Sequence, residues 1–173
     1  MALIDVLYFA FFWIVTIPLL TLLHECGHAI AALACTNQPV TVDLGNATSP
    51  GRTIAVRRLR IRLRPFSTIF GSVDASLEHT SSFQRAIIFA AGPFVSGAVA
   101  VILAYVAFVA DGVPPALQSP VISGLYCAVA QTATTAIPIR YPRWLGSYGG
   151  VESDGLRIMK LFVPTSPQSP PSA

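Results

Sequence analysis

The sequence predicts an integral membrane protein that is mainly α-helical. We expect three transmembrane helices with the first one kinked, a small β-hairpin or sheet between the first and second, and a re-entrant segment after the third. Two observations predict this class. Only 11% of the 173 residues are charged and 53% are hydrophobic, whereas about 25% of residues are charged in a soluble domain. The apolar residues also lie in runs close to the roughly 20 residues that cross a bilayer core. Composition therefore excludes a soluble domain and a disordered chain.

The first apolar segment predicts a transmembrane helix at about residues 6–35. Its part from Val6 to Leu23 carries no charge. Pro18 lies inside this helix and cannot donate a hydrogen bond to the carbonyl of Ile14, so we expect a kink there. No basic residue precedes Asp5, which disfavours a cleaved signal peptide.

A non-helical region at about residues 39–74 follows. Residues 39–44 (PVTVDL) predict a short strand. In residues 58–64 arginine alternates with leucine or isoleucine, a period of two that places all the arginines on one face of a strand. We expect that face to turn its guanidinium groups toward lipid phosphates. Residues 67–74 predict a further strand.

Two further apolar segments predict transmembrane helices at about residues 86–110 and 116–136. Small residues recur in both at every fourth position, which lets helices approach closely in lipid. They are Gly92, Ser96 and Ala100 in the second helix and Gly124, Ala128, Thr132 and Ala136 in the third.

The chain after the third helix is irregular and rich in proline and glycine over residues 137–153, which predicts the re-entrant segment. A helical pattern resumes at Asp154 and ends at Phe162. Residues 164–173 are rich in proline and serine, so we expect a disordered tail. Residues 1–163 would then form one membrane-embedded core.

The basic residues predict the orientation of this core. Six arginines lie in one short stretch: Arg52, Arg57, Arg58, Arg60, Arg62 and Arg64. Three spans place this stretch and the C-terminus on the same side, which the positive-inside rule assigns to the cytoplasm, with the N-terminus outside. Anionic lipid headgroups are the expected partners of the arginines. Nucleic acid is not, because no aromatic residues are interleaved with them. A prokaryotic plasma membrane is the expected location.

The motif His24-Glu25-Cys26-Gly27-His28 carries the chemistry. Its two histidines are four positions apart, so they share one helix face and could hold a single zinc ion. Glu25 beside them could act as a general base. Ionisable groups inside a transmembrane helix indicate a functional site, although a polar cluster that only holds helices together is the alternative.

A catalytic zinc ion takes three protein ligands, and the sequence leaves the third ligand open. His79, Glu152 and Asp154 are the candidates. Asp154 could instead cap the helix that begins there. The cysteines number three and show no disulfide or metal spacing, so we expect them to be reduced, and Cys26 is not an expected ligand.

Three motifs in order make the chain resemble the site-2 protease family of intramembrane zinc metalloproteases. They are HECGH in the first span, Ala91-Gly92-Pro93 in the second and Ser153-Asp154-Gly155 after the third. The resemblance implies a minimal three-helix core. It also implies one Zn²⁺ ion held by His24, His28 and Asp154, with Glu25 as the catalytic base.

The resemblance also bears on substrate binding. The family often carries Asn-x-x-Pro before the aspartate, and here Thr135 stands in the place of the asparagine, ahead of Pro138. Thr135 is therefore a candidate substrate-binding residue. Gly71 is another, because an extended substrate could add to the expected strand at residues 67–74. Thr135, His79 and Arg140 are the candidates for stabilising an oxyanion.

The predicted function is a zinc-dependent intramembrane endopeptidase that hydrolyses a peptide bond in a transmembrane or juxtamembrane segment of a membrane-protein substrate. The main alternative is a non-proteolytic, zinc-binding membrane chaperone or regulator of the same fold. A different membrane metalloprotease with Glu152 as the third ligand is a second alternative. A metal transporter is disfavoured, because one intramembrane ligand cluster provides no second gate.

Overall fold

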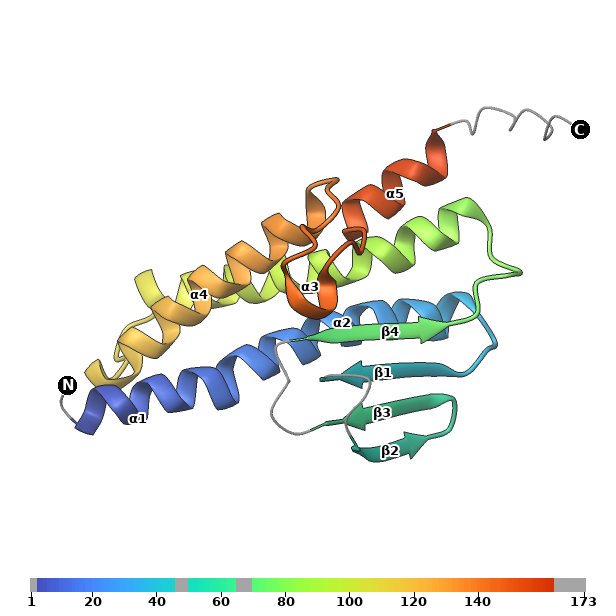
Figure 1. Cartoon of the computed structure of the whole chain (residues 1–173). Helices are drawn as coiled ribbons and strands as arrows, with labels where there is room; N and C mark the ends of the chain where they lie inside the picture. Colours follow the sequence, from blue (N-terminus) through green and yellow to red (C-terminus); the bar gives the residue numbers. More distant parts are fainter. Residues whose placement is uncertain (1–2, 46–49, 65–69, 164–173) are drawn as a thin grey trace, which may run out of the picture.

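The computed structural model describes residues 3–45, 50–64 and 70–163. Three long helical rods run alongside one another, and a small sheet covers one end of the first rod (Figure 1). The first rod consists of α1 (Leu3–Phe11), a π-helical turn at Phe12–Thr16 and α2 (Ile17–Cys35). Its apolar stretch, Val6–Cys35, is long and apolar enough to cross a membrane, as predicted.

The irregularity expected in the first rod takes the form of the π-helical turn. Pro18 lies in the first turn of α2, directly after the π-helical residues. Because proline has no backbone N–H, the regular hydrogen-bond ladder cannot continue through it, and a π-helical turn is one way to absorb the interruption.

The second rod is α3 (Ser82–Phe108), which begins earlier than the predicted residue 86. Ser81 and Gln84 form a capping box: Ser81 Oγ accepts a hydrogen bond from the Gln84 N–H, and Gln84 Oε1 accepts one from the Ser81 N–H. This reciprocal capping fixes the start of the helix. Arg85 therefore lies inside the helix, where its guanidinium donates to the Leu77 carbonyl at 2.9 Å.

The third rod is α4 (Pro115–Ala136), close to the predicted bounds. Among the described helices, only the rod Val6–Cys35 and α3 are long and apolar enough to cross a membrane. Two of the three predicted spans therefore have the length and composition that crossing requires, while the crossing itself stays a prediction for all three. Polar side chains lower the hydropathy of α4; they are Gln118, Ser119, Ser123, Gln131, Thr132, Thr134 and Thr135.

The sheet lies between the first and second rods in the sequence, and its strand order is β2-β3-β1-β4. β1 pairs in parallel with β3, while the other two pairings are antiparallel. The strands predicted at residues 39–44 and 58–64 are confirmed, and β2 was not predicted. Residues 67–69 of the third predicted strand lie outside the described residues. The strands are β1 (Val40–Leu44), β2 (Arg52–Val56), β3 (Leu59–Leu63) and β4 (Gly71–Ala75).

The apolar face of the sheet packs against α2 and α3. Val40 and Val42 are fully buried in one core cluster with Ala29 and Ala32 of α2 and Ile88 of α3. The alternation predicted in β3 is confirmed, because Leu59 and Ile61 pack on this cluster while Arg60 and Arg62 point to the other face. The sheet is thereby fixed against the helix that carries the HECGH motif.

Residues 137–153 fold into a hairpin-like loop before α5 (Asp154–Phe162). Its two arms are joined by hydrogen bonds from the N–H of Tyr141 to the carbonyl of Val151 and from the N–H of Ser153 to the carbonyl of Ile139. A 3-10 turn at Gly146–Tyr148 forms the tip. The tail expected at residues 164–173 lies outside the described residues.

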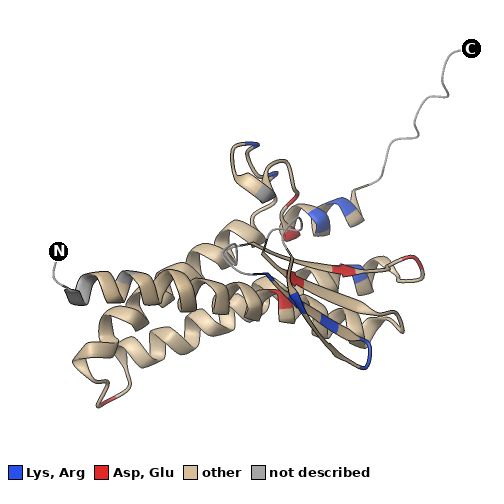
Figure 2. Cartoon of the chain, turned by 60° about the horizontal axis from the view of Figure 1, so that its bottom comes forward, with Lys and Arg blue, Asp and Glu red and all other residues tan. Residues whose placement is uncertain are grey.

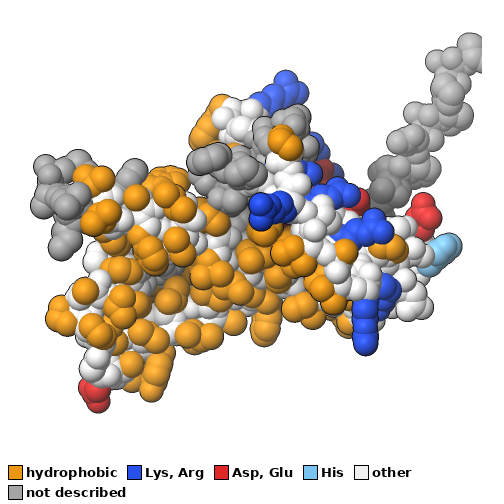
Figure 3. All heavy atoms as spheres, turned by 90° about the horizontal axis from the view of Figure 1, so that it is seen from below, with side chains coloured by type: hydrophobic (Ala, Val, Ile, Leu, Met, Phe, Trp, Pro, Cys, Tyr) orange, Lys and Arg blue, Asp and Glu red, His pale blue; other side chains and the backbone are white. Residues whose placement is uncertain are grey.

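Charged and apolar side chains separate along the molecule. The charged ones gather on the sheet, the loop 137–153 and α5 (Figure 2). Apolar side chains cover the rods away from the sheet (Figure 3), and they include Ile14, Phe94 and Val101, each at least 70% exposed. Such a surface suits contact with lipid rather than with water.

Candidate metal centre

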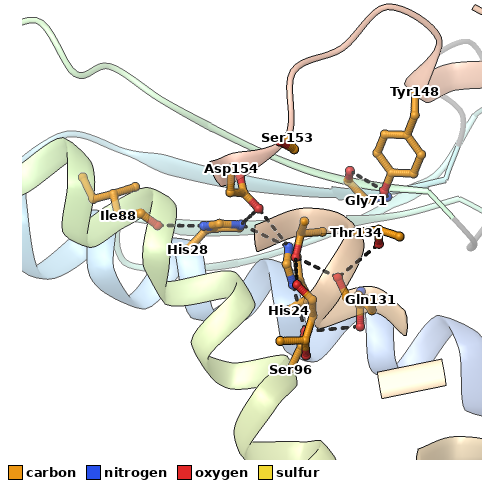
Figure 4. Close-up of polar contacts among 12 residues, drawn as sticks. His24, His28, Gly71, Ile88, Ser96, Gln131, Thr134, Tyr148, Ser153 and Asp154 are labelled. Carbon is orange, nitrogen blue, oxygen red and sulfur yellow. Dashed lines mark hydrogen bonds and ion pairs between the residues drawn. The ribbon is translucent and has the colours of Figure 1, made fainter. Parts of the chain in front are cut away.

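Two helices bring three metal-binding side chains together. His24 and His28 lie on one face of α2, and Asp154 is the first residue of α5 (Figure 4). The Nε2 atoms of the two histidines are 3.2 Å apart. Asp154 Oδ2 lies 3.4 Å from His24 Nε2 and 3.3 Å from His28 Nε2. All three residues are buried, so the cluster is screened from bulk water.

Glycines make this convergence possible. A Cβ atom on Gly92 would overlap the ring of His28, and one on Gly27 would lie 2.6 Å from the carbonyl oxygen of Ala91. α2 and α3 can therefore approach closely only because both positions lack a side chain. Gly155 plays the same part for α5, since a Cβ atom there would overlap the carbonyl of Ala136 at the end of α4.

Hydrogen bonds fix the protonation of both imidazole rings. His28 Nδ1 lies 2.7 Å from the Ile88 carbonyl oxygen, and a carbonyl can only accept, so Nδ1 carries the proton. His24 Nδ1 lies 2.9 Å from Ser96 Oγ, which donates in turn to Gln131 Oε1 at 3.3 Å. The serine oxygen therefore accepts from Nδ1. Both Nε2 atoms then turn a lone pair toward Asp154, an arrangement typical of metal-ligating histidines.

Three lone-pair-bearing atoms at this spacing need a positive charge among them. A proton can bridge one pair of these atoms, whereas a metal ion can satisfy all three. Tetrahedral zinc with ligands at about 2.0–2.1 Å requires its donor atoms to lie about 3.3–3.4 Å apart. The observed separations of 3.2–3.4 Å meet that requirement. His24, His28 and Asp154 therefore form a group that could hold a metal ion.

Asp154 is the carboxylate of this group. Burial acts to raise its pKa, but without a metal ion a proton bridging Asp154 and the Nε2 atoms of His24 and His28 outweighs burial and lowers the pKa to about 2. The side chain is therefore ionised at neutral pH and available as a ligand. The alternative of Asp154 as the helix cap is wrong, because Ser153 takes that position and its Oγ accepts from the Leu156 N–H.

Glu25 lies beside the metal-binding group and faces a cavity of about 790 Å³. Its side chain packs on Gly71 of β4 so closely that a Cβ atom there would lie 2.6 Å from Glu25 Cγ. The two predicted substrate-binding residues, Gly71 and Thr135, both line this cavity. Thr135 Oγ1 donates to the Gln131 carbonyl of its own helix. Their roles stay predictions.

The other candidates lie outside this group. His79 is exposed in the turn between β4 and α3. Glu152 pairs with Arg140 and with Lys160 on the outer side of the loop, and this pairing also occupies the Arg140 guanidinium. Cys26 is a free, half-buried thiol.

The predicted site lacked Ser96, which bonds to His24, and Gln131, which bonds to Ser96. A polar residue in an apolar helix is the signal that could have identified them. The predicted site also lacked Tyr148, whose hydroxyl contacts Gly71. No local pattern marks that tyrosine.

Two histidines that could hold a metal ion lie next to a buried glutamate on a helix apolar enough to cross a membrane. This combination is typical of a membrane metallopeptidase. The model of peptidase family M50 matches residues 12–149, and the chain belongs to this family, that of the site-2 proteases. A search of curated proteins found no match. The family match ends before Asp154, so the place of this residue in the group rests on the geometry and on the Ser153-Asp154-Gly155 motif.

Proposed function

We propose that the protein is a zinc-dependent intramembrane endopeptidase that hydrolyses a peptide bond in a transmembrane or juxtamembrane segment. One observation carries the proposal. Three donor atoms with the spacing of a tetrahedral metal site converge beside Glu25, in a cavity that borders a free sheet edge.

His24, His28 and Asp154 would hold the zinc ion, with Glu25 as the catalytic residue. Zinc in such a site supplies Lewis-acid chemistry that activates water and polarises the scissile carbonyl. Glu25 accepts a proton from the attacking water on its carboxylate and delivers it to the nitrogen of the leaving amine. Glu25 is buried and faces the cavity, so the proton passes to and from its carboxylate on the cavity side.

The substrate must be extended at the cleaved bond, because an α-helix engages its own carbonyl groups. β4 is an edge strand of the sheet, and its Gly71, Val73 and Ala75 line the cavity. We propose that the unwound substrate segment adds to this edge. Gly71 would let its backbone approach Glu25, and Thr135 would contact it from α4.

The separation of charges supports an orientation in which the sheet, the loop 137–153 and α5 face the cytoplasm. All three rods would then cross the membrane, with the N-terminus outside. Arg57 and Arg60 are exposed and would contact anionic headgroups. Arg58 and Arg64 serve the fold instead, because Arg58 donates to the Leu33 carbonyl and Arg64 pairs with Asp43.

The test is cleavage of a set of single-span membrane proteins by detergent-purified protein, with zinc content measured on the same samples. Glu25→Gln should retain zinc and lose cleavage by a factor of about 10² to 10⁴. Glu78→Gln, a change at an exposed glutamate, is the matched control and should cleave normally. If Glu25→Gln cleaved as fast as the wild type, the cleavage would not depend on Glu25, and the proposed mechanism at this site would be excluded. If no substrate were cut while Glu25→Gln bound them normally, the chaperone alternative would be favoured.

A further inference from the structure

The free edge of β4 presents specific backbone groups to the cavity. In the antiparallel pair of β1 and β4, Leu44 lies opposite Gly71, and the neighbouring Phe70 carbonyl accepts from the Gly45 N–H. Backbone groups of successive residues point to opposite sides of a strand. Gly71 therefore turns its N–H and C=O away from β1, and Val73 does the same.

The backbone groups of Gly71 are already engaged. The Tyr148 hydroxyl accepts a hydrogen bond from the Gly71 N–H at 2.9 Å and donates one to the Gly71 carbonyl at 3.2 Å. These are the two bonds that an added strand would make with this residue. Burial raises the pKa of the Tyr148 phenol, so the hydroxyl stays protonated and able to donate.

Tyr148 is held by its ring as well as by its hydroxyl. The ring lies 5.1 Å from the ring of Phe70 and 5.7 Å from that of Tyr141, measured between centroids. The residue comes from the tip of the loop 137–153 and reaches Gly71 of the sheet (Figure 4). Gly71 in turn packs against the Glu25 side chain. Tyr148 therefore occupies the position on the edge strand that lies against the proposed catalytic base.

We infer that Tyr148 is a built-in competitor of the substrate backbone, which must displace its hydroxyl from Gly71 before a peptide bond can lie against Glu25. This inference rests on the proposed function, because it takes the β4 edge as the place where an extended segment adds. In this inference the loop 137–153 blocks the β4 edge, and only a segment able to form strand hydrogen bonds with Gly71 displaces it.

Side-chain hydrogen bonds fix the base of the loop, and glycines flank its tip. Ser153 is 1% exposed and fixes the base, since its Oγ donates to the Ile137 carbonyl and accepts from the Ile139 N–H. Two glycines with positive φ angles, Gly146 at +54° and Gly150 at +81°, flank Tyr148. Glycine tolerates many backbone conformations, and the Gly150 N–H bonds to the Tyr141 carbonyl. We therefore expect the displacement of Tyr148 to be confined to the tip and to leave Asp154 in place.

The test removes only the competing hydroxyl. Tyr148→Phe keeps the ring and frees Gly71, while Tyr141→Phe removes a neighbouring phenol that donates to the Thr134 carbonyl instead. Both changes are made in the Glu25→Gln protein, so that binding is measured without turnover. The probe is a fluorescent synthetic peptide of about 20 leucine and alanine residues, interrupted by a central Gly-Pro pair, and its affinity is measured by anisotropy in detergent.

Tyr148→Phe should bind the probe about three- to tenfold more tightly and should exchange the Gly71 amide hydrogen faster. Tyr141→Phe should change neither quantity. Unchanged or weaker binding in Tyr148→Phe would overturn the inference, because the tyrosine would then support the site rather than close it. If Tyr148→Phe binds the probe more tightly but the protein with Glu25 intact cleaves no substrate, the competition by Tyr148 is supported and the proposed proteolysis is overturned. Failure of this inference and failure of the proposed function are therefore distinguishable.

Discussion

Two parts of the cavity wall differ in construction. The helical wall, formed by α2 and α3, holds both histidines by hydrogen bonds to Ile88 and Ser96. Its helices approach closely at Gly27, which lies against the Ala91 carbonyl, and at Gly92, which lies against the His28 ring. The opposite wall consists of β4 and the loop 137–153. There, side-chain contacts such as the one between Tyr148 and Gly71 join the two elements.

The difference shows which wall must hold its side chains at fixed positions. Ligand geometry tolerates little displacement, and the helical wall meets this demand with rigid elements in direct backbone contact. An extended substrate needs space and free backbone groups, and the strand-and-loop wall can provide both after a local movement. Changes in the helical wall should alter metal binding, whereas changes in the strand-and-loop wall should alter turnover alone.

The largest effect is expected when the only ligand from outside the helical wall is removed. Asp154→Ala should weaken zinc binding by more than about 100-fold, since even the partners of metal ligands are worth 10- to 100-fold. Glu152→Ala, two positions away, should retain zinc because its carboxylate pairs with Arg140 and Lys160. Zinc titration of the purified proteins measures this, and loss of zinc in the Glu152 variant alone would refute the assignment.

Gly92→Ala tests the helical wall directly. The added Cβ atom would overlap the His28 ring, so the ring must leave its position and zinc affinity should fall by about 100-fold. Gly97→Ala in the same helix is the control, because its Cβ atom would meet Thr132 Cγ2 at an ordinary 3.7 Å. Equal zinc affinity in the two variants would show that the close approach of α2 and α3 does not position the ligand.

Gly71→Ala tests the opposite wall. Its Cβ atom would lie 2.6 Å from Glu25 Cγ and 2.8 Å from Glu25 Oε1, so the glutamate must shift while the ligands stay in place. We expect normal zinc content and a fall in turnover of up to about 100-fold, measured as kcat for a cleaved single-span protein. A parallel loss of zinc would mean that the two walls are not independent.

The smallest effect is expected for the hydrogen-bond partner of a ligand. Ser96→Ala removes the hydroxyl that accepts from His24 Nδ1, which leaves the ring less firmly oriented. Zinc affinity should fall by about tenfold, and competition with a chelator measures the change. An affinity equal to that of the wild type would exclude an orienting role for Ser96.

The two walls also differ in how far the sequence predicts them. The spacing within HECGH places His24 and His28 on one helix face, and the apolar runs set the helix bounds, so the helical wall follows from local patterns. The predicted start of α3, residue 86, is the first residue of the uncharged run after Arg85. The Ser81–Gln84 capping box marks the true start, at Ser82.

The opposite wall depends on contacts between distant segments. Tyr148 and Gly71 are 77 positions apart, and no periodicity relates them. β2 was missed because its residues are exposed and show no alternation of buried and exposed positions. The residues alone left Asp154 as one of several candidates for the third ligand, and the resemblance selected it. That Ser153, not Asp154, caps α5 is visible only in the fold.

X-ray absorption at the zinc edge, on protein loaded with one equivalent of the metal, tests the central claim most directly. The account predicts one tightly bound ion with two imidazole nitrogens and at least one oxygen at about 2.0–2.1 Å, and loss of an imidazole contribution in His28→Ala. A sulfur neighbour at about 2.3 Å, as Cys26 would give, or a spectrum unchanged by His28→Ala would contradict it.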